Sequence, residues 1–430
     1  MFTTAIDMFK NKDIRNKIIF TLIMLFVFRF GAAVTVPGVN IDSLVSATNE
    51  ASLFGIMNML GGGSIEKLSI FALGVGPYIT ASIILQLLSM DIIPYLTELS
   101  KSGGKGRKKI DIYTRYLAVV LCFVQAITML GAMQSQYSIF KNPSTSQYLY
   151  VATLLTAGSM FLLWIGDRIT LKGIGNGLSI IIFAGIVSNM PYQFYTSFVS
   201  LVGTKTGSAM FNGILSFSFY IIIYLAIIVL VVFMSTAERK IPIQYTSSTI
   251  QTNKKDMNYL PLKINSASVI PVIFAQAVMI APVTIASFFK QNAFTKALVN
   301  VLDMGSVHGL ILYSVLILFF TFFYTNLTVD PDKISENLGK SGTYIPGIRP
   351  GAETKNYVSK VLNRITVLGA LFLLFIALLP YVAPKILKGL PANMALGGTG
   401  LIIVVGVAME TVKGLKGQLT QKSYRSFIKR

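Results

Sequence analysis

The chain has 430 residues, of which 53% are hydrophobic and only 13% are charged, and its formal net charge is +20. Soluble domains carry roughly 25% charged residues, so this composition excludes a soluble enzyme and indicates a polytopic membrane protein. The single cysteine, Cys122, excludes a disulfide within the chain and a cysteine-based metal site.

Apolar runs of about twenty residues, the length that crosses a bilayer, occur ten times along the chain. The predicted spans are Ile18–Val36, Leu68–Leu88, Tyr116–Met133, Tyr148–Ile165, Leu178–Tyr195, Phe211–Met234, Val269–Phe289, Val307–Leu327, Ile365–Val382 and Leu396–Val412. An even number of spans places both termini on the same side of the membrane.

The basic residues are distributed unequally between the two sides. The connections that share a side with the termini hold 29 of the 37 Lys and Arg residues, and the connections on the other side hold 7. Basic residues mark the cytoplasmic side, so we expect both termini in the cytoplasm. The net charge therefore reflects topology first, although basic loops can also dock anionic lipid, an acidic partner or a ribosome.

Ten spans divide into two sets of five, residues 1–203 and 204–430. Because each half has an odd number of spans, the second half is inverted relative to the first, and such repeats place a functional site between the halves. The predicted fold is an all-α polytopic membrane protein built from two inverted five-helix halves.

The second span has unusual neighbours and an unusual composition. The segment before it, Leu53–Leu60, is apolar but too short to span, which predicts a short helix re-entering from the outer side. Gly74, Gly76 and Pro77 then interrupt the span itself. Such residues are tolerated where protein or water forms hydrogen bonds with the freed backbone groups. We therefore expect this span to lie inside the bundle and to line an interior surface of the protein.

Polar side chains lie at membrane depth in three spans, where weak interhelical hydrogen bonds would suit a contact that opens. They are Thr80, Ser82, Gln86, Gln125 and Gln276.

Isoleucines also stand four apart, on one helical face, at Ile79 and Ile83 and again at Ile182 and Ile186. Two interpretations stay open for them, ordinary packing and a hydrophobic constriction that blocks ions by dewetting.

No set of residues in the spans resembles a catalytic centre or a metal site, so we expect neither enzymatic activity nor a cofactor. Coupled transporters keep ionisable residues in their core, and here Arg29 is the only charged residue well inside a span. The energy for any transport is therefore expected to come from outside the chain.

One cation stands out in the loop between spans eight and nine. Arg349 lies between two Pro-Gly pairs, Pro346-Gly347 and Pro350-Gly351. Pro-Gly favours a type II turn, and a proline biases the residue before it towards an extended backbone. The pattern predicts a cation held at a defined loop tip, or a solvated residue that marks the cytoplasmic side.

Several long motifs, in order along nearly the whole chain, resemble the bacterial SecY family of protein-translocation channels. The matching stretches include PYITASIILQLL within Ser69–Leu88, GIGNGLSIIIFAGI at Gly173–Ile186, AERKIPIQY at Ala237–Tyr245, the VIPVIFA end of Tyr259–Ala275, TYIPGIRPG at Thr343–Gly351, and Gly397–Val405.

The resemblance implies a fold and a set of site residues. Two halves would be hinged like a clamshell, with a lateral gate between spans two and three and spans seven and eight, where Gln125 and Gln276 would lie. A plug would occupy about 53–62, with Leu53, Phe54, Ile56, Met57, Leu60, Gly61 and Gly62. The pore ring would consist of Ile79, Ile83, Ile182, Ile186, Ile273 and Ile403.

The resemblance also implies partners. Arg349 would belong to a loop that docks the SecA motor ATPase. The cytoplasmic loops at 235–265 and 328–364 would also face the ribosome; their basic residues include Arg239, Lys240, Lys254 and Lys255. SecE- and SecG-like small membrane subunits would accompany the chain, and secretory preproteins with their signal sequences would be its substrates. Thr246-Ser247-Ser248 stands where many members of the family carry basic residues. Whether the tip of the first loop docks a partner is therefore left open.

The expected function is a passive protein-conducting channel in the bacterial cell membrane. It would pass unfolded secretory chains and release hydrophobic segments sideways into lipid. A secondary transporter of a small solute is the main alternative, because the ten-span inverted layout would suit it too. A membrane scaffold or insertase is a third interpretation, and it predicts no ion leak when the plug is deleted.

Overall fold

The computed structural model describes most of the chain. Its residues are 10–39, 64, 68–89, 92–137, 139–140, 143–203, 207–245, 258–286, 293–303, 305–386 and 398–428.

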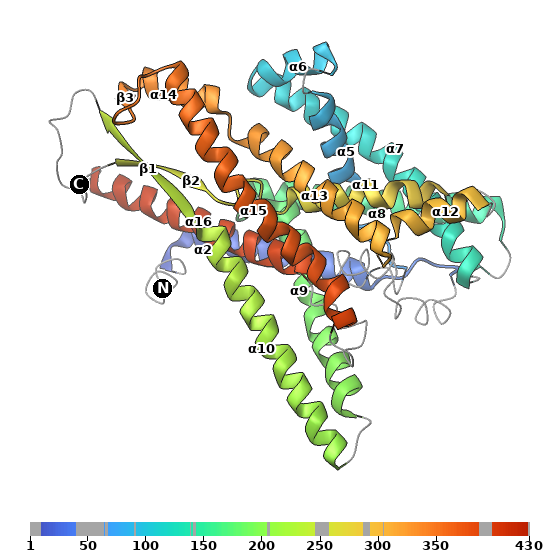
Figure 1. Ribbon diagram of the computed structural model, residues 1–430. Coiled ribbons are helices and arrows are strands. Elements are labelled where there is room, and N and C mark those ends of the chain that lie inside the picture. Colours follow the sequence, from blue (N-terminus) through green and yellow to red (C-terminus); the bar gives the residue numbers. More distant parts are fainter. Residues whose placement is uncertain are drawn as a thin grey trace.

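Helices that overlap the ten predicted spans form the body of the described structure (Figure 1). They are α2 (Lys12–Ala33), α5 (Gly76–Leu88), α7 (Gly104–Tyr137), α8 (Thr145–Lys172), α9 (Gly177–Phe198), α10 (Ser208–Thr236), α11 (Ile270–Ala286), α13 (Val307–Thr328), α15 (Ala352–Ile386) and α16 (Gly398–Ile428). Within the described residues, seven helices are long and apolar enough to cross a membrane, and α5 and part of α11 are apolar but shorter. The chain is therefore a helical, multi-span membrane protein, as predicted.

The second predicted span is helical only from Gly76, which agrees with the interruption expected at Gly74, Gly76 and Pro77. Pro77 lies in the first turn of α5, where its missing N–H costs no helical hydrogen bond. The Ser159 hydroxyl on α8 donates to the carbonyl oxygen of Gly74 in the irregular segment. Protein rather than lipid thus satisfies backbone groups of this segment, which agrees with its expected place inside the bundle.

Short elements that the sequence analysis did not predict occupy the connections. They are α6 (Pro94–Lys101), η1 (Val199–Gly203), α12 (Ala293–Leu302), α14 (Pro331–Lys340), β1 (Glu238–Tyr245), β2 (Asn258–Lys263) and β3 (Thr343–Tyr344). The strands form one antiparallel sheet in the order β2-β1-β3. Glu238 pairs with Lys263, and Tyr245 pairs with Thr343, so the sheet joins two loops that are far apart in the sequence.

The basic connections gather at one end of the molecule. In Figure 1, α6, α14, the sheet, the start of α2 and the end of α16 lie towards the upper and left edges, whereas α12 and the far ends of α9, α10 and α15 lie towards the lower and right edges. The Lys17 amine donates to the side-chain oxygen of Gln418 over 3.1 Å, which makes the start of α2 and the end of α16 neighbours. This arrangement agrees with an even number of spans.

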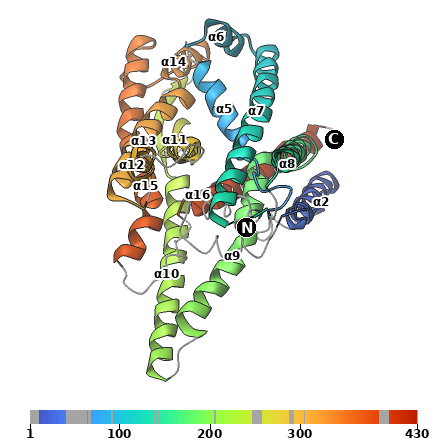
Figure 2. The same ribbon diagram turned by 90° about the vertical axis from the view of Figure 1, so that its right-hand side faces the viewer.

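Buried hydrophobic residues of the membrane part form three clusters. Two of them contain buried residues from Phe28 to Ile181 only. The third runs from Tyr220 to Val405 and is joined by Ile83, Leu201 and Val202; we call it the second-half cluster. Two clusters thus draw on early residues and one mainly on late residues, while the division at residue 203 stays a prediction. Figure 2 shows α5 and α7 facing the group formed by α11, α13 and α15.

Candidate functional site

The isoleucines predicted to form a constriction come from four helices. On α5, α9, α11 and α16 in turn, they are Ile79, Ile83, Ile182, Ile186, Ile273 and Ile403. Ile186 is 1% exposed, and Ile83 and Ile403 are buried as well.

Ile79 occupies the junction between the halves. It packs against the second-half cluster and also against the first-half cluster that contains Phe71 and Ile180. Ile182 packs against the first-half cluster, and Ile273 against the second-half cluster. The structure therefore places four of the six side chains in or against the clusters on the two sides of one junction, while a closed ring of all six stays a prediction.

Two of the predicted gate residues line a cavity, and the other three lie elsewhere on α5, α7 and α11. Ser82 and Gln86 line a cavity of about 650 Å³ at the end of α5. Gln276 on α11 is 7% exposed, and Gln125 on α7 is half-buried. The Thr80 hydroxyl donates to the Gly76 carbonyl oxygen within α5. Because α11 contacts both α5 and α7, these polar side chains lie on the helices that meet where a lateral gate is predicted.

The cavity beside Ser82 and Gln86 is polar and draws on both halves. Hydroxyls of α5, α6 and α7 line it together with the cations Lys101 and Arg107, and the second half contributes Leu327 and Asp330. Hydroxyl and amide side chains both donate and accept hydrogen bonds, so such a wall can satisfy the backbone of an extended peptide.

Neighbouring groups stabilise the ionised form of the Asp330 carboxyl group. Burial alone would raise the pKa of this carboxyl, but the Lys333 amine and the backbone N–H groups of Lys333 and Asp332 outweigh that effect and hold the pKa below its ordinary value. The Lys333 amine lies 3.1 Å from the carboxylate, and the same carboxylate caps the first turn of α14.

Arg349 projects from a loop whose backbone conformation is fixed. The N–H of Ile348 donates to the carbonyl oxygen of Ile345 over 3.0 Å, and Gly347 and Gly351 have φ of 81° and 98°. Only glycine adopts such φ values without steric cost, so both Pro-Gly pairs have the backbone that the sequence predicts. Arg349 is exposed between them, and among the described residues no ion pair involves its guanidinium.

The loops at 235–265 and 328–364 share a small apolar core. Ile241 and Leu262 from the β1–β2 hairpin pack with Ile345 of the Arg349 loop and with Val358 and Leu362 of α15. This core, which we call the loop core, and the pairing of β1 with β3 make the two loops one structural unit.

Some predicted docking and plug residues can be placed and others cannot. Arg239 and Lys240 are exposed on β1. Lys254, Lys255 and the segment Thr246-Ser247-Ser248 lie outside the described residues. The plug residues also lie outside the described residues; they are Leu53, Phe54, Ile56, Met57, Leu60, Gly61 and Gly62.

Comparison with known proteins identifies the family. A family profile described as SecY matches residues 69–412, well over half of the chain. The chain belongs to the SecY family. A relative named "Protein translocase subunit SecY" from Staphylococcus carnosus (strain TM300) is 44% identical over 435 residues, which cover 99% of this chain and 99% of the relative.

Solved structures share the SecY-family fold. One described as "The structure of a protein conducting channel" aligns with a TM-score of 0.66 at 18% identity, covering 93% of this chain and 91% of that chain. Another, "Sec61 in the Canine ribosome-channel complex from the endoplasmic reticulum", aligns with a TM-score of 0.62 at 19% identity, with the same coverage.

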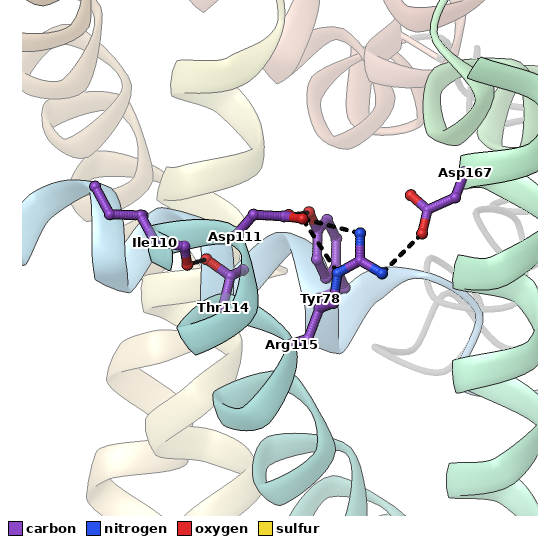
Figure 3. Close-up of polar contacts among 6 residues, drawn as sticks. All are labelled: Tyr78, Ile110, Asp111, Thr114, Arg115 and Asp167. Atoms are coloured by element: carbon purple, nitrogen blue, oxygen red, sulfur yellow. Dashed lines mark hydrogen bonds and ion pairs between the residues drawn. The ribbon is translucent and has the colours of Figure 1, made fainter. Parts of the chain in front are cut away.

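One polar network in this SecY-family chain was missed by the sequence analysis, which treated its charges only as topology or helix-end residues (Figure 3). Arg115 on α7 lies 2.9 Å from a carboxylate oxygen of Asp111 and 3.0 Å from one of Asp167 on α8. The Tyr78 hydroxyl on α5 donates to Asp111 over 3.2 Å. The network ties α5, α7 and α8 together. The i, i+4 spacing of Asp111 and Arg115 was its only local signal.

Proposed function

We propose that the chain is the channel subunit of a bacterial protein translocon and passes unfolded secretory polypeptides across the cell membrane. Membership of the SecY family over residues 69–412 carries this proposal. The small-solute transporter alternative gains no support from the family or from the solved channels that share the fold.

The geometry suits a polypeptide path between the halves. Ile79 lies at the junction of the clusters, and the other five isoleucines would complete a seal around it. Apolar side chains in a narrow passage exclude water and ions without binding them. A translocating chain would separate these residues, and its hydrophobic segments would leave between α5 and α7 on one side and α11 and α13 on the other, with the plug at about 53–62 closing the resting channel.

The energy would come from a partner. Arg349 and the exposed cations of β1 would dock a SecA-like motor ATPase or a ribosome, and the chain itself would hydrolyse nothing. SecE- and SecG-like subunits would cover its apolar flanks, and anionic lipid would meet its basic loops. Because Lys and Arg gather on the side of the termini, that side would face the cytoplasm.

Cross-linking of an arrested secretory chain tests the proposal. A photoreactive amino acid would replace Ile79, and a control probe would replace Leu371, which is 54% exposed on α15. We expect adducts at position 79 that require the motor and ATP, and none at position 371. Absence of adducts at position 79, with the protein folded and its partners present, would contradict the channel assignment.

A further inference from the structure

The backbone on both sides of the Arg349 side chain is held by three other side chains. The Thr354 hydroxyl donates to the Arg349 carbonyl oxygen over 2.9 Å, and the Arg349 N–H donates to a carboxylate oxygen of Glu353 over 3.3 Å. The Ser335 hydroxyl donates to the carbonyl oxygen of Gly351 over 2.7 Å. Both peptide groups of Arg349 and the carbonyl group of Gly351, the residue before α15, are therefore held by side chains of α14 and α15.

Two of the three supporting side chains are buried, whereas Glu353 and the Arg349 side chain itself are exposed. Thr354 is 2% exposed and Ser335 is 8% exposed, whereas the Arg349 side chain extends into solvent. A buried hydroxyl that lost its acceptor would have no water to replace it, so these hydrogen bonds hold the loop in one conformation.

The support also connects two helices. Ser335 belongs to α14, while Glu353 and Thr354 belong to α15, and the Lys355 amine lies 2.7 Å from a carboxylate oxygen of Asp332 between the same helices. The loop core lies beneath this junction through Ile345. The cation is thus presented by a rigid corner rather than by a free loop.

We propose that Ser335, Glu353 and Thr354 are positioning residues that hold the backbone at Arg349 in the conformation that presents its guanidinium to a carboxylate on the docking partner. A guanidinium binds a carboxylate through two parallel hydrogen bonds in one plane, a geometry that lysine cannot reproduce. Fixing the backbone from which this side chain extends before binding lowers the entropy that association costs. This inference rests on the docking role of Arg349 under the proposed function.

The test compares variants in proteoliposomes that contain the chain, its small subunits and increasing concentrations of the motor. For Ser335→Ala combined with Thr354→Val, we expect the motor concentration at half-maximal translocation to rise about fivefold or more, because preorganisation is lost. The maximal rate at saturating motor should stay near that of the unaltered chain. The single variant Thr354→Ser keeps both the hydroxyl at position 354 and the intact Ser335. It should therefore dock the motor as well as the unaltered chain does.

Ser341→Ala is the matched control, because the hydroxyl of Ser341, which follows α14, donates to the Asn337 carbonyl oxygen and, within the described part of the chain, makes no hydrogen bond with the Arg349 loop. It should leave the half-maximal concentration unchanged. Arg349→Lys should weaken docking although the charge remains. Thermal unfolding in detergent checks that each variant is folded.

Three results would overturn the inference, and each has a different meaning. If Arg349→Glu is defective but the double variant behaves like Ser341→Ala, the support of the backbone is irrelevant and the docking role stands. If Arg349→Glu itself docks and translocates normally, the docking role fails and the inference fails with it. A fall in maximal rate without a change in half-maximal concentration would assign Ser335 and Thr354 to a step after docking.

Discussion

Two isoleucines carry the clearest prediction at the scale of single residues. Ile83 is 9% exposed within the second-half cluster, and Ile186 is 1% exposed on α9. Replacing either by Ser places a hydroxyl where the proposed seal needs an apolar surface. We expect resting ion conductance across a bilayer to rise, as measured by single-channel recording.

A core residue away from the junction provides the control. Ile376 on α15 is 0% exposed in the same cluster, and its replacement by Ser should cost about 2–5 kcal/mol of stability, as buried truncations do. Ile376→Ser should therefore destabilise the protein without opening a path. An equal leak from all three variants would mean that conductance reports loosened packing and would return Ile83 and Ile186 to an ordinary packing role.

The residues around Arg349 show what sequence can and cannot reveal about a site. The two Pro-Gly pairs were sufficient to predict the turns, because φ restrictions are local properties of proline and glycine. The supporting hydroxyl of Ser335 could not be found in this way, since its partner Gly351 is sixteen positions away and serines occur on every exposed surface. Likewise, the salt bridge between Arg115 and Asp167 joins two helices that no local pattern pairs.

At the scale of elements, the close contact of α8 with the irregular segment before α5 predicts a stability effect. A Cβ on Gly158 would clash with the backbone carbonyl of Ile70, which cannot move as a flexible side chain could. Gly158→Ala should therefore destabilise the protein by about 1–3 kcal/mol, as overpacking does. The free energy of unfolding in detergent, from a denaturant titration, measures it.

Gly131→Ala on α7 is the matched control, because nothing lies within 4 Å of its Cβ. Alanine favours a helix by about 1 kcal/mol over glycine, so this variant should be neutral or slightly stabilising. Similar unfolding curves for the two variants would show that α8 can move away from Ile70.

Asp330 is expected to control the start of α14. Its carboxylate accepts hydrogen bonds from the N–H groups of Asp332 (3.0 Å) and Lys333 (3.3 Å), so Asp330→Ala should weaken the helix by about 0.5–2 kcal/mol, while Asp330→Asn should cap it nearly as well. Hydrogen exchange of the α14 amides distinguishes them. Equal protection in both variants would exclude the cap.

The same cap gives a pH dependence with a defined sign. The pKa of folded Asp330 is below the ordinary value of 3.8, so its stabilising effect is fully present above that value and is lost as the pH falls through the lower folded pKa. We therefore expect protection of α14 to be insensitive to pH near neutrality in the unaltered chain.

Helices and strands differed in how far they could be foreseen. Each predicted span overlaps a helix. In lipid, a segment of about twenty apolar residues can form all its backbone hydrogen bonds only within a helix. The sheet could not be foreseen in the same way. Its β1 strand pairs with β3 across about a hundred residues, and such pairing depends on the tertiary arrangement of the loops rather than on local sequence.

At the scale of the whole molecule, the arrangement of the charged connections predicts which residues can be labelled from each side. Ser144, at the start of α8, and Ser341, after α14, are both exposed. In a Cys122→Ala background the chain has no other cysteine. A membrane-impermeant thiol reagent added to intact cells should label Ser144→Cys, and should label Ser341→Cys only after lysis. The reverse pattern would invert the proposed topology.

The hydrogen bond between Lys17 and Gln418 has a consequence for biosynthesis. The helix α2 emerges early in synthesis, but its contact on α16 emerges about four hundred residues later. Because α16 also packs on α9 and α10 and contributes Leu401 to the second-half cluster, a nascent chain that stops before residue 398 leaves faces of both halves uncovered. We therefore expect the helix assembly to close only after α16 has been made, and a product that terminates before α16 to expose the surfaces that α16 covers.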